Sequence, residues 1–166
     1  MDKAVGYKPY DKDLHREVAW TENRLQKQIQ INGCSIIRNP DKYGIDFYVM
    51  KDNVILGGIE VELHGKYWKE TFPFQTVHFL GRKAKCIEKH CFYIMVNEDY
   101  SDALMIPFTQ LEKFKTDKIE TTYTTKEPIF DIPLECCTWG WLNIIAELNL
   151  YFKNEINKLR DIAVYW

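Results

Sequence analysis

Apolar residues spaced by three and four positions predict a helix near each end of the chain. Residues Leu14, Val18, Leu25 and Ile29 form one such stripe, which is typical of a helix with one buried face. We expect this helix to end at Asn32-Gly33, because Gly is favoured just past a helix end. Residues 138–160 carry a longer stripe and predict a second amphipathic helix, which packs on the core or on the mate of a homodimer.

Between the two helices, short β-branched and aromatic runs alternate with polar turns. The runs that predict strands are "CSIIR", "IDFYVM", "NVILGGIEVEL", "FQTVHFL", "CFYIMVN" and "DALMIPF". Lys51-Asp52-Asn53 joins the second run to the third, which favours a hairpin. We interpret Gly57-Gly58 as a bulge or a close approach of another backbone, and residues 113–126 as a loop or an edge strand. This order predicts a single α/β domain over residues 1–166, with a mixed sheet flanked by helices.

Composition and charge narrow the classes of function. The chain has 166 residues and a formal net charge of -2, so it is long enough for one buried core and has no overall basic signature. Any contact with nucleic acid must therefore come from a local basic patch. The five cysteines are irregularly spaced and no apolar leader is present, so we expect a cytoplasmic protein. No apolar run is long enough to suggest a membrane span.

Three carboxylates fall within the predicted hairpin. Residues two apart in a strand share a face, so Glu60 and Glu62 point the same way and away from Val61. Folding about the turn brings Asp46 opposite roughly Gly58 to Glu60. Because neighbouring carboxylates repel each other, a divalent cation would stabilise such a cluster, and oxygen ligands favour Mg²⁺ or Mn²⁺. The alternative is that these acids only solvate the outer face of an edge hairpin.

A fourth acid, Glu22, lies at the edge of the apolar stripe of the first predicted helix. From this position its side chain would face the sheet, where the hairpin acids are expected. The alternative is a boundary residue that reaches water or pairs with a lysine. The position of Glu22 around the helix axis is compatible with both roles.

The run "TENRLQKQIQINGCSIIRNPDKYGIDFYVMKDNVILGGIEVEL", Thr21 to Leu63, resembles the PD-(D/E)XK nuclease superfamily, and within it the archaeal Holliday junction resolvase type of core. The matching features are a helix with a Glu, a Gly before a short strand, an Asp on a strand, and an acid-x-residue motif on the next strand. The resemblance covers about a quarter of the chain. It implies a restriction-endonuclease-like fold and a metal-dependent endonuclease that acts on DNA.

The resemblance also assigns roles to residues. Asp46, Glu60 and the backbone carbonyl of Val61 would hold one cation, and Glu22 would bind a second ion or orient its water. Glu62 stands where most members have a lysine, an E-x-E variant that some restriction endonucleases also carry. Glu62 would then act as a general base or as a ligand to a second ion. The candidates to replace the missing lysine are Lys66, Lys69, Lys83 and Lys85.

Contacts with the substrate are expected near the aromatic-rich run "YWKETFPFQTVHF". Arg82, Lys83 and Lys85 form the densest basic cluster, which is either a phosphate-binding patch or a solvated loop. Lys66 is a further candidate, and Gln75 resembles a glutamine that some members place near the site. The leading alternative function is a catalytically inactive domain of this fold that binds nucleic acid or a protein. A third is a structural protein whose acids solubilise an edge.

Overall fold

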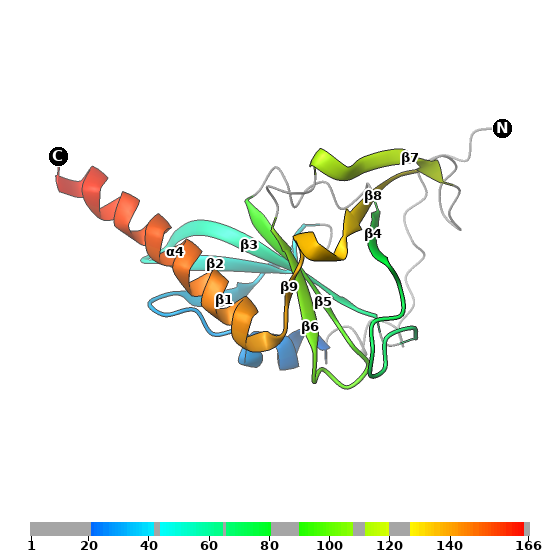
Figure 1. Ribbon diagram of the computed structural model, residues 1–166. Coiled ribbons are helices and arrows are strands. Elements are labelled where there is room, and N and C mark those ends of the chain that lie inside the picture. Colours follow the sequence, from blue (N-terminus) through cyan, green and yellow to red (C-terminus); the bar gives the residue numbers. More distant parts are fainter. Residues whose placement is uncertain are drawn as a thin grey trace.

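The computed structural model describes residues 21–41, 44–64, 66–80, 90–107, 112–119 and 127–164 (Figure 1). A helix covers residues 21–28, here called the Glu22 helix, and the helix α4 covers Trp141–Val164. The strands are β1 Ser35–Arg38, β2 Phe47–Lys51, β3 Val54–Leu63, β4 Thr76–Leu80, β5 Cys91–Val96, β6 Ala103–Pro107, β7 Lys115–Ile119, β8 Glu127–Pro133 and β9 Thr138–Trp139. Two short 3₁₀ helices, Glu112–Phe114 and Leu134–Cys136, precede β7 and follow β8.

Within the described ranges, the strands form two sheets. The larger has six strands in the order β1-β2-β3-β5-β6-β9, and the smaller has three in the order β4-β8-β7. Strands β3 and β5 run parallel, whereas the other neighbours in both sheets run antiparallel. The expectation of a mixed α/β fold is therefore confirmed.

The larger sheet is the middle of three layers. Its first face packs against the Glu22 helix and α4 through an apolar cluster that contains Leu25, Ile29, Phe47, Ile59, Ile94, Ile144, Leu148 and Phe152. The second face packs against the smaller sheet through Trp68, Val77, Tyr93, Met95, Leu104, Phe130 and Ile132. Figure 1 shows α4 on one side of the larger sheet and β4, β7 and β8 on the other. Helices were expected to flank the sheet, but in the described residues a second sheet covers this face.

The predicted β2–β3 hairpin is confirmed, with its turn at Asp52-Asn53. Both turn residues have positive φ, 49° and 64°, which matches the two-residue turn whose twist suits a hairpin. Further along, Val49 pairs with Gly57 while Met50 pairs with Ile55, so β3 carries one extra residue as a bulge.

The backbone also comes close to β3 at Gly57. A Cβ atom on Gly57 would lie 2.7 Å from the carbonyl oxygen of His90, so a side chain is excluded unless β5 shifts. The close approach is therefore confirmed at Gly57, whereas the bulge falls one residue earlier, at Leu56, because Gly57 and Gly58 are both paired with β2.

Each helix has one boundary that differs from its prediction, and the predicted start of the first helix, with Leu14 and Val18, lies outside the described residues. The Glu22 helix ends at Gln28, because Ile29 and Ile31 are both buried in the same core, and residues two apart cannot share a helix face. The second helix begins at Trp141 rather than at residue 138, because Thr138 and Trp139 pair with β6 as β9. Gly140, with φ of 78°, separates β9 from the helix.

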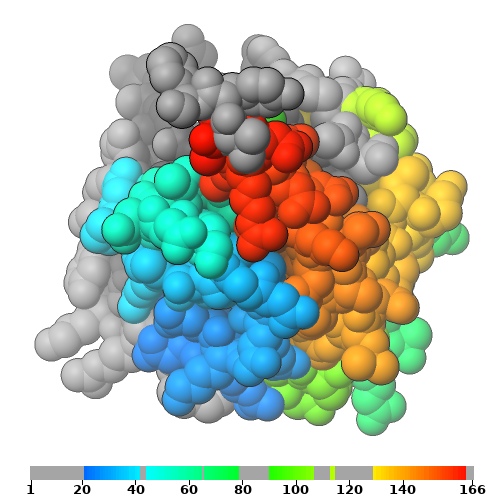
Figure 2. All heavy atoms as spheres, turned by 90° about the vertical axis from the view of Figure 1, so that its left-hand side faces the viewer, coloured from blue at the N-terminus to red at the C-terminus, as the bar shows by residue number. Residues whose placement is uncertain are grey.

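The helix α4 also holds the segment that leads into β1. Asn149 accepts a hydrogen bond from the backbone N–H of Asn32 at 2.7 Å and donates one to the carbonyl oxygen of Gln30 at 3.2 Å. Figure 2 shows α4, in orange and red, beside this blue segment and the cyan β2–β3 hairpin. In the part of the chain that is described, neither helix has the length and apolar character to cross a membrane.

Candidate functional site

Asp46 and Glu60 lie at the open end of the β2–β3 hairpin. The pairing of β2 with β3 ends at Phe47 and Ile59, and Asp46 and Glu60 are each the next residue beyond that pair. Because Ile59 packs into the helix-covered core, Glu60 points to the opposite face, where it is only 2% exposed. Asp46 Oδ2 accepts a hydrogen bond of 2.8 Å from the backbone N–H of Val61. This bond holds the Asp46 carboxylate against β3.

Glu62 lies two residues further along the same face and is held by Tyr93. In the parallel pairing of β3 with β5, Tyr93 stands beside Glu60, and its hydroxyl donates a hydrogen bond to Glu62 Oε2. The Glu62 side chain is 40% exposed, in contrast to Glu60, so the site opens to solvent at Glu62. We call Asp46, Glu60 and Glu62 the acid cluster.

Glu22 reaches the same end of the sheet from the helix-covered face. It is buried and forms an ion pair with Arg38, the last residue of β1. Arg38 pairs with Phe47 in the sheet, and the next residue, Asn39, donates its N–H to the carbonyl oxygen of Asp46 at 2.9 Å. Glu22 therefore belongs to the same end of the fold as the acid cluster, but it contacts an arginine on the other face of the sheet.

Two contacts at this site were not found from the sequence. Tyr93 lies in a run that predicts a fully buried strand, and nothing in the sequence indicates which strand pairs with β3. Arg38 is a single arginine before a turn, and its pairing with Glu22 depends on how the Glu22 helix crosses β1. The only usable signal was the position of Glu22 at the edge of the apolar stripe.

Of the four lysines expected to replace the motif lysine, the two that the structure describes contact other groups. The ammonium group of Lys66 lies 5.0 Å from the centroid of the Tyr67 ring, and that of Lys69 lies 3.9 Å from a Glu98 carboxylate oxygen. Gln75 is exposed, directly before β4. Arg82, Lys83 and Lys85 lie outside the described residues.

The donor set suits a partly hydrated cation better than an all-protein cage. Among residues that the structure describes, no group of three or more His, Cys, Asp or Glu side chains is arranged to hold a metal ion. Mg²⁺ commonly binds through one or two carboxylates, with waters and substrate phosphates completing its shell. The pair Asp46 and Glu60 would supply carboxylate oxygens of the kind that this mode uses.

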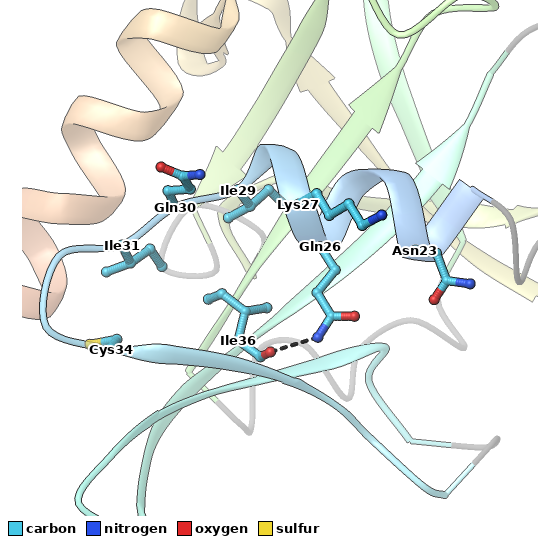
Figure 3. A pocket seen from close by; sticks show the side chains of 8 residues that line it. All are labelled: Asn23, Gln26, Lys27, Ile29, Gln30, Ile31, Cys34 and Ile36. Carbon is cyan, nitrogen blue, oxygen red and sulfur yellow. Dashed lines mark hydrogen bonds between the residues drawn. The ribbon is translucent and has the colours of Figure 1, made fainter.

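A separate pocket of about 710 Å³ lies between the Glu22 helix and β1 (Figure 3). Gln26 crosses it and donates a hydrogen bond of 2.8 Å to the carbonyl oxygen of Ile36. The lining residues are Asn23, Gln26, Lys27, Ile29, Gln30, Ile31, Cys34 and Ile36. None of them is a carboxylate, so this pocket does not share the chemistry of the acid cluster.

No family model matches the chain, and neither a curated protein nor a solved structure matches it. The function is therefore argued from the residues and their geometry.

Proposed function

We propose that the chain is a divalent-metal-dependent endonuclease that hydrolyses phosphodiester bonds in DNA. The observation that supports this proposal is the contact of the Asp46 carboxylate with the backbone of Val61, directly beside the buried Glu60. Two carboxylates so placed repel each other, and a divalent cation between them would lower the free energy of the site. The mixed sheet with two helices on one face is the part of the fold that supports this proposal, whereas the second sheet on the other face is not part of what the resemblance implies.

Asp46 and Glu60 would hold Mg²⁺ or Mn²⁺, and the hydrogen bond from Val61 would keep the Asp46 carboxylate in one orientation. When bound, such an ion polarises a phosphoryl oxygen and lowers the pKa of water. Glu62, at the solvent-exposed side of the cluster, would accept a proton from the attacking water. Tyr93 would fix the Glu62 carboxylate for that task through its hydroxyl.

Arg38 would supply positive charge for the substrate. Its side chain is about half exposed, and the buried carboxylate of Glu22 orients the guanidinium at the end of β1. Guanidinium groups bind phosphate oxygens in a fixed fork geometry. In this arrangement Glu22 positions Arg38, whereas the resemblance assigned it a second metal ion or that ion's water.

The second candidate is a catalytically inactive domain of the same fold that binds nucleic acid or a protein partner. The observation that favours it is the position of the lysines, because Lys66 and Lys69 contact Tyr67 and Glu98 rather than the acid cluster. A site that carries Glu62 in place of the motif lysine and recruits neither lysine would bind without hydrolysis.

Cleavage assays separate the two candidates. Purified protein is incubated with duplex, branched and single-stranded DNA, and with RNA, in Mg²⁺, Mn²⁺ or EDTA. We expect cleavage of DNA that EDTA abolishes and that Asp46→Asn and Glu60→Gln each reduce by about a hundredfold or more. The matched control is Asp161→Asn, which changes an exposed carboxyl on α4.

Metal-dependent cleavage that survives both substitutions would contradict the site. Binding of DNA or of a protein with no cleavage in either metal would favour the inactive domain.

A further inference from the structure

Four rings gather beside the acid cluster, in the segment that links β3 to β4. We call His64, Tyr67, Phe72 and Phe74 the aromatic platform. The ring of Phe74 has its centroid 6.1 Å from that of His64, 6.0 Å from that of Tyr67 and 5.6 Å from that of Phe72, in edge-to-face arrangements. Two of the rings remain open to solvent, since Tyr67 is 52% exposed and Phe74 is 44% exposed.

The platform rests on the core. Phe72 packs edge-to-face on Trp68 and Trp139, with centroid distances of 5.2 and 5.6 Å. Trp68 is fully buried, and its indole N–H has no hydrogen-bond partner among the described residues. The backbone N–H of Trp68 donates to the carbonyl oxygen of His64 at 2.9 Å. The exposed rings therefore stand on a packed base, and adjacent exposed aromatic rings of this kind mark a binding surface.

The platform continues directly from the acid cluster. Glu60, Glu62 and His64 follow each other at two-residue spacing, and His64 Nδ1 lies 3.9 Å from Glu62 Oε1. Because a strand rises by about 3.3 Å per residue, His64 is about 13 Å along the chain from Glu60. A ligand that spans a few nucleotides would reach both.

Positive charge borders the exposed rings. The ammonium group of Lys66 lies over the Tyr67 ring, and its contact with the Tyr67 side chain raises the pKa of Lys66. Lys69 is also exposed. Exposed rings with cations beside them match the way proteins hold single strands, by stacking bases on aromatic side chains and binding the backbone with basic groups.

We propose that the aromatic platform stacks unpaired bases, so that the substrate class of the acid cluster is nucleic acid with a single-stranded stretch. This inference rests on the proposed nuclease function, because it takes the acid cluster to be the site that the single strand enters. A paired duplex keeps its bases stacked on each other and presents no free base face to Tyr67 and Phe74. Phosphates that follow the stacked bases would lie toward Glu62 and Glu60.

Binding in EDTA tests the stacking without cleavage. Fluorescence anisotropy compares a short oligothymidine, an abasic strand of the same length and charge, and a duplex of that length, with a single-stranded RNA as a further arm. Tyr67→Leu and Phe74→Leu keep apolar bulk but remove the rings, whereas Tyr67→Phe and Phe74→Tyr keep them. Leu142→Ala, at an exposed position on α4, is the unrelated control.

We expect the strand with bases to bind at least about fivefold more tightly than the abasic strand, and each leucine variant to lose about fivefold or more. The ring-preserving variants and Leu142→Ala should bind like the wild type. Equal binding of the abasic strand or the duplex, or leucine variants that bind like the wild type, would overturn the stacking. Failure to bind any oligonucleotide would overturn it too, and would leave a protein as the occupant of the platform.

The two proposals fail separately. Selective binding of single strands by a protein that cleaves nothing in Mg²⁺ or Mn²⁺ would refute the nuclease and retain the stacking. Metal-dependent cleavage of a plain duplex that Tyr67→Leu leaves unchanged would refute the stacking and retain the nuclease.

Discussion

The repulsion between Asp46 and Glu60 is open to a direct test through Asp46→Asn. This change removes one negative charge, while the amide oxygen of Asn still accepts the hydrogen bond from Val61. Residues opposite each other in an antiparallel pair have Cβ atoms about 5 Å apart. Two unit charges at that separation repel by about 3 kcal/mol at an effective dielectric constant of about 20. Asp46 is only half-buried, so water screens the pair and we expect about 1–2 kcal/mol.

In EDTA, the asparagine variant should therefore be more stable than the wild type. For a chain of this length, each kcal/mol raises the midpoint of thermal unfolding by about 2–4 °C. Saturating Mn²⁺ should reverse the order, because binding of an ion adds about 2.7 kcal/mol to the wild type at a concentration of a hundred times its Kd. The variant, with one ligand fewer, should gain much less.

Thermal unfolding of both proteins in EDTA and in Mn²⁺ measures the four midpoints. Asp161→Asn, on the exposed side of α4, should follow the wild type in both conditions. An Asp46→Asn protein that is less stable than the wild type in EDTA would refute the repulsion. An Asp46→Asn protein whose unfolding midpoint rises as much in Mn²⁺ as that of the wild type would show that Asp46 is not a ligand of the metal.

Three further predictions follow from contacts elsewhere in the fold. Arg38→Ala should lower the free energy of unfolding by about 1–3 kcal/mol, because it leaves the buried Glu22 carboxylate without its guanidinium partner. Chemical denaturation measures this loss, and the double variant with Glu22→Gln should recover part of it. Gly57→Ala should destabilise the protein by about 1–3 kcal/mol, because the new Cβ meets the His90 carbonyl oxygen; an unchanged denaturation midpoint would refute the close approach. Burial raises the pKa of the Cys137 thiol to about 12, with the neighbouring Cys136 and Glu135 adding to the effect. Its thiolate should therefore be scarce at pH 8, and a thiol reagent should label it at least about a hundredfold more slowly in the folded protein than in urea, as peptide mapping of the labelled sites would show.

Local features of the sequence were enough to predict the hairpin and the face on which Glu60 lies. The turn at Asp52-Asn53 needs residues that tolerate positive φ, and the alternation of Ile59, Glu60 and Val61 fixes which side chains share a face. Counting residues away from the turn alone would set Asp46 across from Ile59, and the extra residue of the bulge in β3 shifts the register by one, to the level of Glu60.

Pairings between distant segments could not be predicted from the sequence. Strand β8 and the division of the strands into two sheets were not predicted, because apolar alternation shows that a strand is buried but not which strand it joins. The contact of Tyr93 with Glu62 spans 31 residues and depends on the parallel register of β3 with β5. The boundary of α4 was misplaced for a similar reason, since only pairing with β6 makes Thr138 and Trp139 a strand.

The position of the acids within the hairpin also has a consequence for how the chain folds. A hairpin with a tight turn forms its strand pairs in order from Asp52-Asn53 outward. Asp46 and Glu60 lie beyond the last of these pairs, Phe47 with Ile59. Their repulsion arises only when the last pair closes, and the docking of β5, a distant segment, adds Tyr93 later still. The charge of the site should therefore act mainly on the rate of unfolding and leave the rate of folding almost unchanged.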